Sequence, residues 1–213
     1  KLLAKNGYLP VTVDRHFREG LVSFGPNYNL NLPQEVSRLD EIIKRYNITS
    51  CIHFAGSTSV PESVANPSLY YKHNFNAAGA DPEGDVGELR EKETHIVPLA
   101  IAAAKQGNTF KIFGDKYPTD DGTCVRDYVH VMDLADAHIK ALNYSSYEKV
   151  AEVFNLGSGE PASNKQLVDA VQKHAGTMKV EMHDNRPGDP AYLVADITKV
   201  KEILDWEPTQ SSI

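Results

Sequence analysis

Apolar residues follow two spacings along this chain. Short runs rich in β-branched and aromatic residues predict strands at residues 9–14, 50–56, 110–113 and 152–157. Apolar residues that return every three or four positions predict helices over residues 34–46 and about 132–143. Because strands and helices alternate in this order, we expect a doubly wound α/β fold, in which helices pack on a parallel sheet.

The last third of the chain predicts smaller elements. Ser163 and Gln166 have the spacing of a capping box at the start of a helix, and Gly176 ends that helix. A second short helix is expected from Asp196 to Trp206, before Pro208. These elements predict a smaller lobe in addition to the main sheet.

Composition narrows the class of protein. The chain has 213 residues, 41% of them hydrophobic, and a net charge of −7, which argues against a nucleic-acid partner because phosphates require a basic surface. No apolar run is long enough to span a membrane and no signal peptide is visible, so we expect a soluble cytoplasmic protein. The chain has two cysteines, Cys51 in an expected buried strand and Cys124, and this number suits a reducing compartment. The histidines and cysteines do not have the spacing of a metal site.

The segment from Phe113 to Asp136 carries the most informative chemistry. A strand is followed by a turn-rich stretch, residues 114–122, which predicts a long surface loop, and then by Arg126-Asp127-Tyr128 and the start of a helix. Arg offers a planar fork of donors that suits a diphosphate, and Tyr offers a flat face with a polar tip. In isolation, an Arg-Asp-Tyr triplet is more typical of a surface ion pair.

This whole segment resembles the corresponding part of the UDP-glucose 4-epimerases (UDP-galactose 4-epimerases), members of the extended short-chain dehydrogenase/reductase superfamily. Other segments resemble the same family in the same order: residues 11–14, 52–64, 70–74 and 75–88, Phe154-Asn-Leu-Gly157 and Arg186-Pro-Gly-Asp189. The resemblance implies an NAD-binding Rossmann-like domain formed by residues 1–78 and 127–157. It implies a UDP-sugar-binding lobe formed by residues 79–126 and 158–213.

The resemblance also implies an activity. Bound NAD would oxidise C4 of the sugar transiently, so that UDP-glucose and UDP-galactose interconvert. A homodimer is expected from the same resemblance. The residues expected to contact NAD are Asp14, whose carboxylate suits the adenosine ribose hydroxyls and disfavours NADP, together with Asn31, Leu32, Phe54, Ala55, Gly56, Asn74 and Phe75.

The expected substrate residues come from the second half of the chain, except for Asn76 and His95. Arg126 and Arg186 are expected to bind the diphosphate, and Asp189 the uridine ribose hydroxyls. Phe113 and Tyr128 would line the uridine pocket. Asn76 would bond the nucleotide diphosphate, and His95 occupies a position near the phosphates.

Two motifs of the family are absent from this sequence. No Gly-x-x-Gly-x-x-Gly turn precedes Asp14, and none of the ten tyrosines has a lysine four positions later. We infer that a block is missing between Asn74 and Phe75, because a strand end cannot follow a helix with no connection. Either this sequence omits part of a longer protein, or the protein itself lacks the block and with it the catalytic base.

The substrate has alternatives. Leu193 stands where the family gates its sugar pocket, and it is neither the small residue nor the large aromatic that would decide whether acetamido sugars fit. Epimerisation of UDP-N-acetylhexosamines or UDP-pentoses therefore remains open. If the deletion is real, the chain is a catalytically inactive module that binds nucleotide sugars.

Overall fold

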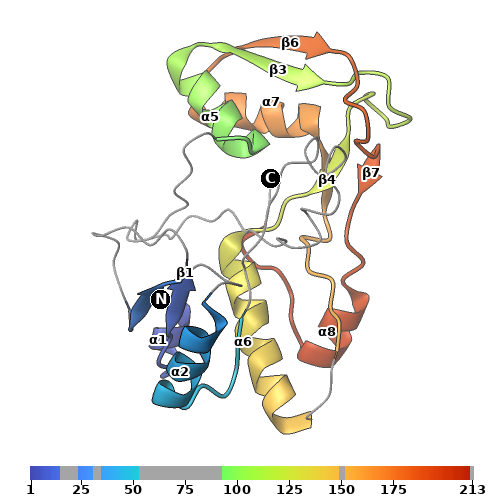
Figure 1. The fold of residues 1–213 in the computed structure, drawn as a ribbon. Helices are drawn as coiled ribbons and strands as arrows, with labels where there is room; N and C mark the ends of the chain where they lie inside the picture. Colours follow the sequence, from blue (N-terminus) through green and yellow to red (C-terminus); the bar gives the residue numbers. More distant parts are fainter. Residues whose placement is uncertain (15–23, 31–34, 53–92, 149–151, 212–213) are drawn as a thin grey trace. The chain divides into compact units, whose positions relative to one another are not determined.

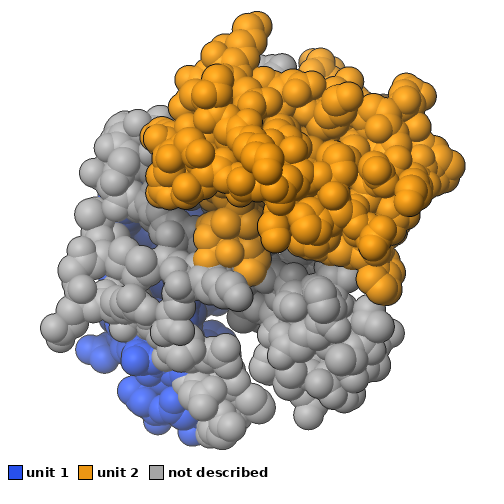
Figure 2. Space-filling view, turned by 90° about the horizontal axis from the view of Figure 1, so that it is seen from above, with its two compact units in different colours: residues 1–88, 138–148 blue, residues 89–137, 149–213 orange. Residues whose placement is uncertain are grey.

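The computed structural model describes residues 1–14, 24–30, 35–52, 93–148 and 152–211 (Figure 1). The chain divides into two compact units, which Figure 2 distinguishes by colour. The first unit comprises residues 1–88 and 138–148, and the second comprises residues 89–137 and 149–213. Residues 127–137 fall in the second of these units. The functional division of the chain expected from the sequence stays a prediction.

The first unit contains a short parallel strand pair. β1 (Thr12–Asp14) pairs with β2 (Asn27–Asn29), and α1 (Leu2–Lys5) precedes β1. α2 (Val36–Tyr46) ends where Asn47 adopts a left-handed conformation. The hydroxyls of Tyr28 and Tyr46 lie 2.7 Å apart, which ties β2 to α2.

One strand predicted for this unit is not formed where the structure describes it. Residues 50–52 of the expected strand 50–56 have no strand pairing, and Cys51 is exposed rather than buried. The expectation of a buried strand rested on apolar composition alone, and a strand also requires a neighbour that hydrogen-bonds to it. The rest of that segment lies outside the described residues.

The main core of the second unit lies between a strand pair and two helices. β3 (Thr109–Phe113) and β6 (Lys179–His183) are parallel, and α5 (Ile96–Gln106) and α7 (Asn164–Ala175) pack together against them (Figure 1). Their buried side chains form one cluster of Ala100, Ala103, Ala104, Phe110, Ile112, Val168, Val171 and Met178. The parallel pairing confirms the α/β class expected from the sequence.

A three-stranded sheet carries Arg126, one of the predicted site residues of this unit. β4 (Val125–Asp127) is its middle strand, antiparallel to β5 (Pro161–Ser163) and parallel to β7 (Tyr192–Leu193). The sequence predicted a surface loop over residues 114–122, and the structure has neither helix nor strand there. It predicted no strand at residues 125–127, because their pairing with two distant strands leaves no local pattern.

Several other predictions can be compared directly. The capping box of α7 is present, because Gln166 N donates to Ser163 Oγ and Ser163 N donates to Gln166 Oε1, and Gly176 follows the last helical residue. The helix α6 (Val131–Glu148) is longer than predicted. The helix α8 (Thr198–Leu204) is shorter than predicted. The strand predicted at 152–157 is wrong, since no strand forms there and Val153 is 79% exposed.

The C-terminal segment is attached to the start of α6. Trp206 is completely buried, and its indole Nε1 donates a 3.0 Å hydrogen bond to the carbonyl oxygen of Asp133. The carboxylate of Asp133, 3% exposed, accepts hydrogen bonds from the backbone of Thr209 and Gln210 and from the hydroxyl of Ser211. Residues 206–211 are therefore held against this helix.

Candidate functional site

Arg126 lies in β4 and reaches the loop that follows β6. Its Nη1 donates 2.8 Å hydrogen bonds to the carbonyl oxygens of Val125 and Pro190. Its Nη2 lies 4.0 Å from Oδ1 of Asp189, and the two side chains are 22% and 24% exposed. A partly buried positive charge thus stands beside a carboxylate at this loop.

The loop itself contains a tight turn. The backbone nitrogen of Asp189 donates a 3.3 Å hydrogen bond to the carbonyl oxygen of Arg186. Pro187 and Gly188 are the two central residues, and Gly188 has a φ of 85°. A proline followed by a glycine with positive φ is the pattern of a type II turn. The turn places Arg186 and Asp189 at its two ends.

Phe113, the last residue of β3, contacts two side chains from the segment after α7. The guanidinium carbon of Arg186 lies 3.8 Å from the centroid of its ring. His183, its partner in the register of β3 and β6, has a ring centroid 5.3 Å away at a tilt of 36°. An exposed guanidinium and a half-buried aromatic ring therefore lie in contact.

Four predicted site residues therefore gather in one place. The contacts above link Phe113 to Arg186, Arg186 to Asp189, and Asp189 to Arg126. Two guanidinium groups suit the oxygens of phosphates, a carboxylate accepts hydrogen bonds from hydroxyls, and an aromatic ring stacks on a planar group. This cluster has the chemistry to bind a phosphorylated ligand with hydroxyls and a planar ring.

Tyr117 belongs to the same neighbourhood, and the sequence analysis missed it. Its ring occupies the space beside Gly114, where a β-carbon would stand 2.1 Å from Tyr117 Cε2. Burial and the nearby Cys124 thiol raise the pKa of the Tyr117 hydroxyl, which is also within electrostatic range of Asp189 and Arg126. Tyr117 therefore packs within the loop before β4, in the electrostatic neighbourhood of Arg126 and Asp189.

Asp121 fastens that loop to α7. Its Oδ1 accepts hydrogen bonds from Thr123 N at 2.9 Å and Thr123 Oγ1 at 2.7 Å, and its Oδ2 accepts one from the hydroxyl of Ser163. Burial alone would raise the pKa of this carboxyl, but these hydrogen bonds outweigh burial and lower it. Hydrogen bonds of Asp121 therefore join the loop to the capped end of α7.

Asp127 connects three chain segments, a role the sequence analysis did not identify. Its Oδ1 accepts hydrogen bonds from Ser158 N at 2.5 Å and Ser158 Oγ at 2.6 Å, and its Oδ2 accepts one from Ala195 N at 3.2 Å. A β-carbon on Gly157 would stand 2.1 Å from Oδ2, so the glycine leaves room for the carboxylate. Asp127 thereby fixes the backbone between Arg126 and Tyr128.

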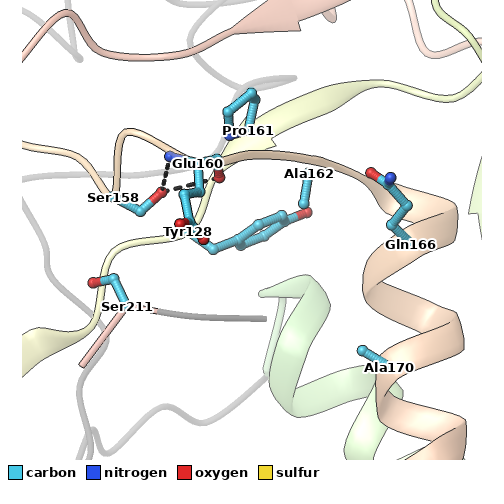
Figure 3. Close-up of a pocket in the computed structure, with 8 residues that line it drawn as sticks. All are labelled: Tyr128, Ser158, Glu160, Pro161, Ala162, Gln166, Ala170 and Ser211. Atoms are coloured by element: carbon cyan, nitrogen blue, oxygen red, sulfur yellow. Dashed lines mark hydrogen bonds between the residues drawn. The ribbon is translucent and has the colours of Figure 1, made fainter. Parts of the chain in front are cut away.

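Tyr128 lines a cavity of about 310 Å³ (Figure 3). Its hydroxyl donates a 3.1 Å hydrogen bond to Oδ1 of Asn164, and burial raises the pKa of that hydroxyl to about 12. Tyr128 therefore stays protonated at neutral pH and does not act as a base. The other lining residues are Ser158, Glu160, Pro161, Ala162, Gln166, Ala170 and Ser211.

His95 begins α5. It is the N-cap residue of that helix, and its Nδ1 lies 3.1 Å from Oε1 of Glu93. The same carboxylate oxygen accepts hydrogen bonds from the backbone nitrogens of Thr94 and His95. The expected contact of His95 with a phosphate stays a prediction.

Among the expected cofactor residues, the structure describes Asp14. It is the exposed last residue of β1, and its carbonyl oxygen accepts a hydrogen bond from Leu30 N. The carboxyl end of a parallel strand is where open α/β sheets bind ligands. The other predicted residues, and the inferred junction between Asn74 and Phe75, lie outside the described residues: Asn31, Leu32, Phe54, Ala55, Gly56, Asn74, Phe75 and Asn76.

Two features are absent from the described part of the chain. Within it, no group of three or more histidine, cysteine, aspartate or glutamate side chains could hold a metal ion. No helix there has the length and apolar character needed to cross a membrane.

The chain is similar to known proteins over nearly its whole length. A family profile described as GDP-mannose 4,6 dehydratase matches residues 85–212. The UDP-glucose 4-epimerase of Rhizobium meliloti is 32% identical over 285 positions, which cover 97% of this chain and 87% of that protein. The UDP-glucose 4-epimerase of Lacticaseibacillus casei is 46% identical over 141 residues, 65% of this chain and 43% of that protein.

A solved structure agrees with these sequence matches. The UDP-glucose 4-epimerase from Brucella ovis in complex with NAD superposes with a TM-score of 0.86 at 28% identity, covering 99% of this chain and 89% of that one. The chain thus has the doubly wound, Rossmann-like α/β fold. Since the match to the Rhizobium protein extends over 285 positions and this chain has 213 residues, at least 72 positions have no counterpart here.

Proposed function

We propose that the complete protein interconverts UDP-glucose and UDP-galactose with bound NAD, because this chain belongs to the UDP-glucose 4-epimerase family of extended short-chain dehydrogenases/reductases. The observation that carries the proposal is the cluster of Phe113, Arg126, Arg186 and Asp189 in the second unit. It contains two guanidinium groups, a carboxylate and an aromatic ring, which are linked by contacts.

We assign the substrate to this cluster. Arg126 and Arg186 would each donate hydrogen bonds to diphosphate oxygens. The Nη2 of Arg126, which lies 4.0 Å from Oδ1 of Asp189, would be the donor on the ligand's side. Asp189 would accept hydrogen bonds from the ribose hydroxyls. Phe113 would support the uracil ring and Tyr128 would line the uridine pocket. Asn76 and His95 complete the proposed contacts to the diphosphate.

We assign the cofactor to residues 1–78 and 127–157 as the NAD-binding part and the substrate to residues 79–126 and 158–213, a division that differs from the bounds of the two compact units. Asp14 fits NAD, because its exposed carboxylate stands at the end of β1, where it can accept the adenosine ribose hydroxyls and would repel a 2′-phosphate. When bound, NAD supplies the hydride acceptor and donor for C4 of the sugar. The chain's own residues would bind and orient the two nucleotides.

The general base of the reaction is not assigned to any of these residues. No Tyr-x-x-x-Lys pair occurs in the 213 residues. Tyr128, the tyrosine closest in sequence to Arg126, is unsuited because burial raises the pKa of its hydroxyl to about 12. The base would belong to the block that the 285 aligned positions require and this sequence does not contain.

A second candidate follows from the same absence. If the 213 residues are the whole protein, it binds nucleotide sugars without epimerising them. Intact mass of the natural protein separates the two candidates, because a mass well above 23.5 kDa indicates a longer enzyme and a match to 23.5 kDa indicates the binding module. Calorimetric titration with UDP then tests binding in either case, and an absence of binding would contradict both.

The preferred sugar is a finer part of the proposal. Leu193, on β7, is 60% exposed, and we place it at the gate of the sugar pocket. Acetamido or pentose sugars remain alternatives to glucose and galactose, and a comparison of initial rates with each UDP-sugar decides between them. We further propose a cytoplasmic homodimer, which sedimentation of the complete protein would test.

A further inference from the structure

Other side chains contact the ring of Phe113 in this structure. The guanidinium carbon of Arg186 stands 3.8 Å from the ring centroid, within the range of a cation–π contact. On the neighbouring strand, His183 lies beside the ring with its centroid 5.3 Å away. A planar group that stacks on Phe113 therefore competes with Arg186 for the same ring.

Arg186 can leave this position without disturbing the backbone. Its backbone is fixed by the turn with Pro187 and Gly188, whose hydrogen bond joins Asp189 N to Arg186 O. Its side chain, in contrast, is exposed, and no described carboxylate forms an ion pair with it. The contact with Phe113 is thus the interaction that a ligand must replace.

We propose that Arg186 makes this site select nucleoside diphosphates over nucleosides, by covering Phe113 until a diphosphate draws the guanidinium away. The inference rests on the proposed function and extends it. A diphosphate offers charged, bidentate hydrogen bonds to the guanidinium as it leaves the ring. A nucleoside must displace Arg186 and gives it no new partner, so its binding is weakened by the whole of the lost contact.

The test compares uridine with UDP on the unmodified protein and on Arg186→Ala. A cation–π contact at an exposed site has a strength that corresponds to about two- to fivefold in affinity. Arg186→Ala should therefore bind uridine about two- to fivefold more tightly than the unmodified protein, and UDP about tenfold or more weakly, because the diphosphate contact is lost. Opposite changes for the two ligands are the expected signature.

Two controls make the result specific. Arg45→Ala removes a similar contact, since Arg45 Cζ lies 5.8 Å from the ring centroid of Tyr46, and it should change neither affinity. Phe113→Leu should weaken uridine binding both in the otherwise unmodified protein and in the Arg186→Ala variant. In NMR spectra of the ligand-free protein, the Arg186 side-chain signals should show a ring-current shift that disappears in Phe113→Leu and on addition of UDP.

The outcomes separate this inference from the proposed function. UDP binding with an unchanged or weaker uridine affinity in Arg186→Ala would keep the function and overturn the selection by Arg186. Absence of any ring-current shift at Arg186 would also overturn it. If neither UDP nor uridine binds the unmodified protein or Arg186→Ala, both the function and the inference are wrong.

Discussion

The carboxylate of Asp133 and the hydroxyl of Ser211, 78 residues apart in the chain, are joined by a 2.6 Å hydrogen bond. The same carboxylate accepts backbone hydrogen bonds from Thr209 and Gln210. Ser211 also lines the cavity that contains Tyr128. One buried aspartate in the first turn of α6 therefore holds the C-terminal segment at the edge of this cavity.

Replacing Asp133 with alanine should destabilise the second unit strongly. The change removes several hydrogen bonds to a buried charge, and we expect the free energy of unfolding to fall by about 2–4 kcal/mol. Urea denaturation followed by circular dichroism measures this. Asp136→Ala is the matched control, because Asp136 is exposed on the same helix and should change stability by less than about 0.5 kcal/mol. Equal effects of both variants would contradict the role assigned to Asp133.

Acid should weaken the second unit through two aspartates. Hydrogen bonds outweigh burial and lower the pKa of both Asp121 and Asp133 in the folded protein. In the unfolded chain, an aspartate titrates near about 3.9. The stabilisation they give is fully present above that pH and is lost as pH falls through the lower folded pKa. Denaturation between pH 7 and about pH 2 should show this loss, reduced in Asp133→Asn.

Gly157→Ala should disturb the residues around β4 without any change of a charged group. Its β-carbon would stand 2.1 Å from Oδ2 of Asp127, so the carboxylate would have to move away from Ser158 and Ala195. We expect a loss of stability of about 1–3 kcal/mol. Gly107→Ala is a useful comparison, since a β-carbon there meets nothing within 4 Å although its φ of 66° still carries a backbone cost. Full stability of Gly157→Ala would show that Asp127 can be accommodated elsewhere.

Arg126→Ala in the complete protein should weaken UDP binding by about ten- to a hundredfold, because a bidentate charged contact to the diphosphate is lost. NAD content should stay unchanged, since Arg126 is assigned to the substrate. Arg38→Ala, which removes an exposed ion pair with Glu35, should leave UDP affinity as it is. If Arg126→Ala bound UDP as tightly as the unmodified protein, Arg126 would be interpreted as one partner of a surface ion pair with Asp189 and not as a substrate residue.

The complete protein should purify with NAD rather than NADP. We assign this distinction to Asp14, so Asp14→Ala should lower NAD affinity by about tenfold. Denaturing release followed by chromatography identifies the cofactor. Asp40→Ala, in which an exposed ion pair with Lys44 is lost, serves as the control and should retain NAD. Release of NADP would contradict the argument from Asp14.

The sequence predicted best what short-range chemistry determines. The capping box between Ser163 and Gln166 lies within four residues and formed as its spacing indicates. Strands were less predictable, because they depend on a distant partner. Residues 125–127 found such partners in β5 and β7, whereas residues 152–157 found none within the described residues.

The candidate site shows the same difference between local patterns and contacts with distant partners. The identities of Phe113, Arg126, Arg186 and Asp189 came from the sequence and its family resemblance, and the structure links them by contact. The roles of Asp127, Tyr117 and Asp121 did not come from the sequence. The bonds of Asp127 come from Ser158 and Ala195, 31 and 68 residues away, and no local pattern could reveal them. One bond of Asp121 likewise comes from Ser163, 42 residues away.

Trp206 gives the protein an optical probe of its own. It is the only tryptophan in the chain, its side chain has no exposed surface, and its indole nitrogen is bonded to Asp133. An indole in such surroundings emits at short wavelength, and its emission moves to longer wavelength when water reaches it. Because Trp206 belongs to the second unit, fluorescence follows the unfolding of that unit alone. Compared with circular dichroism, which follows both, it would resolve whether the two units melt together.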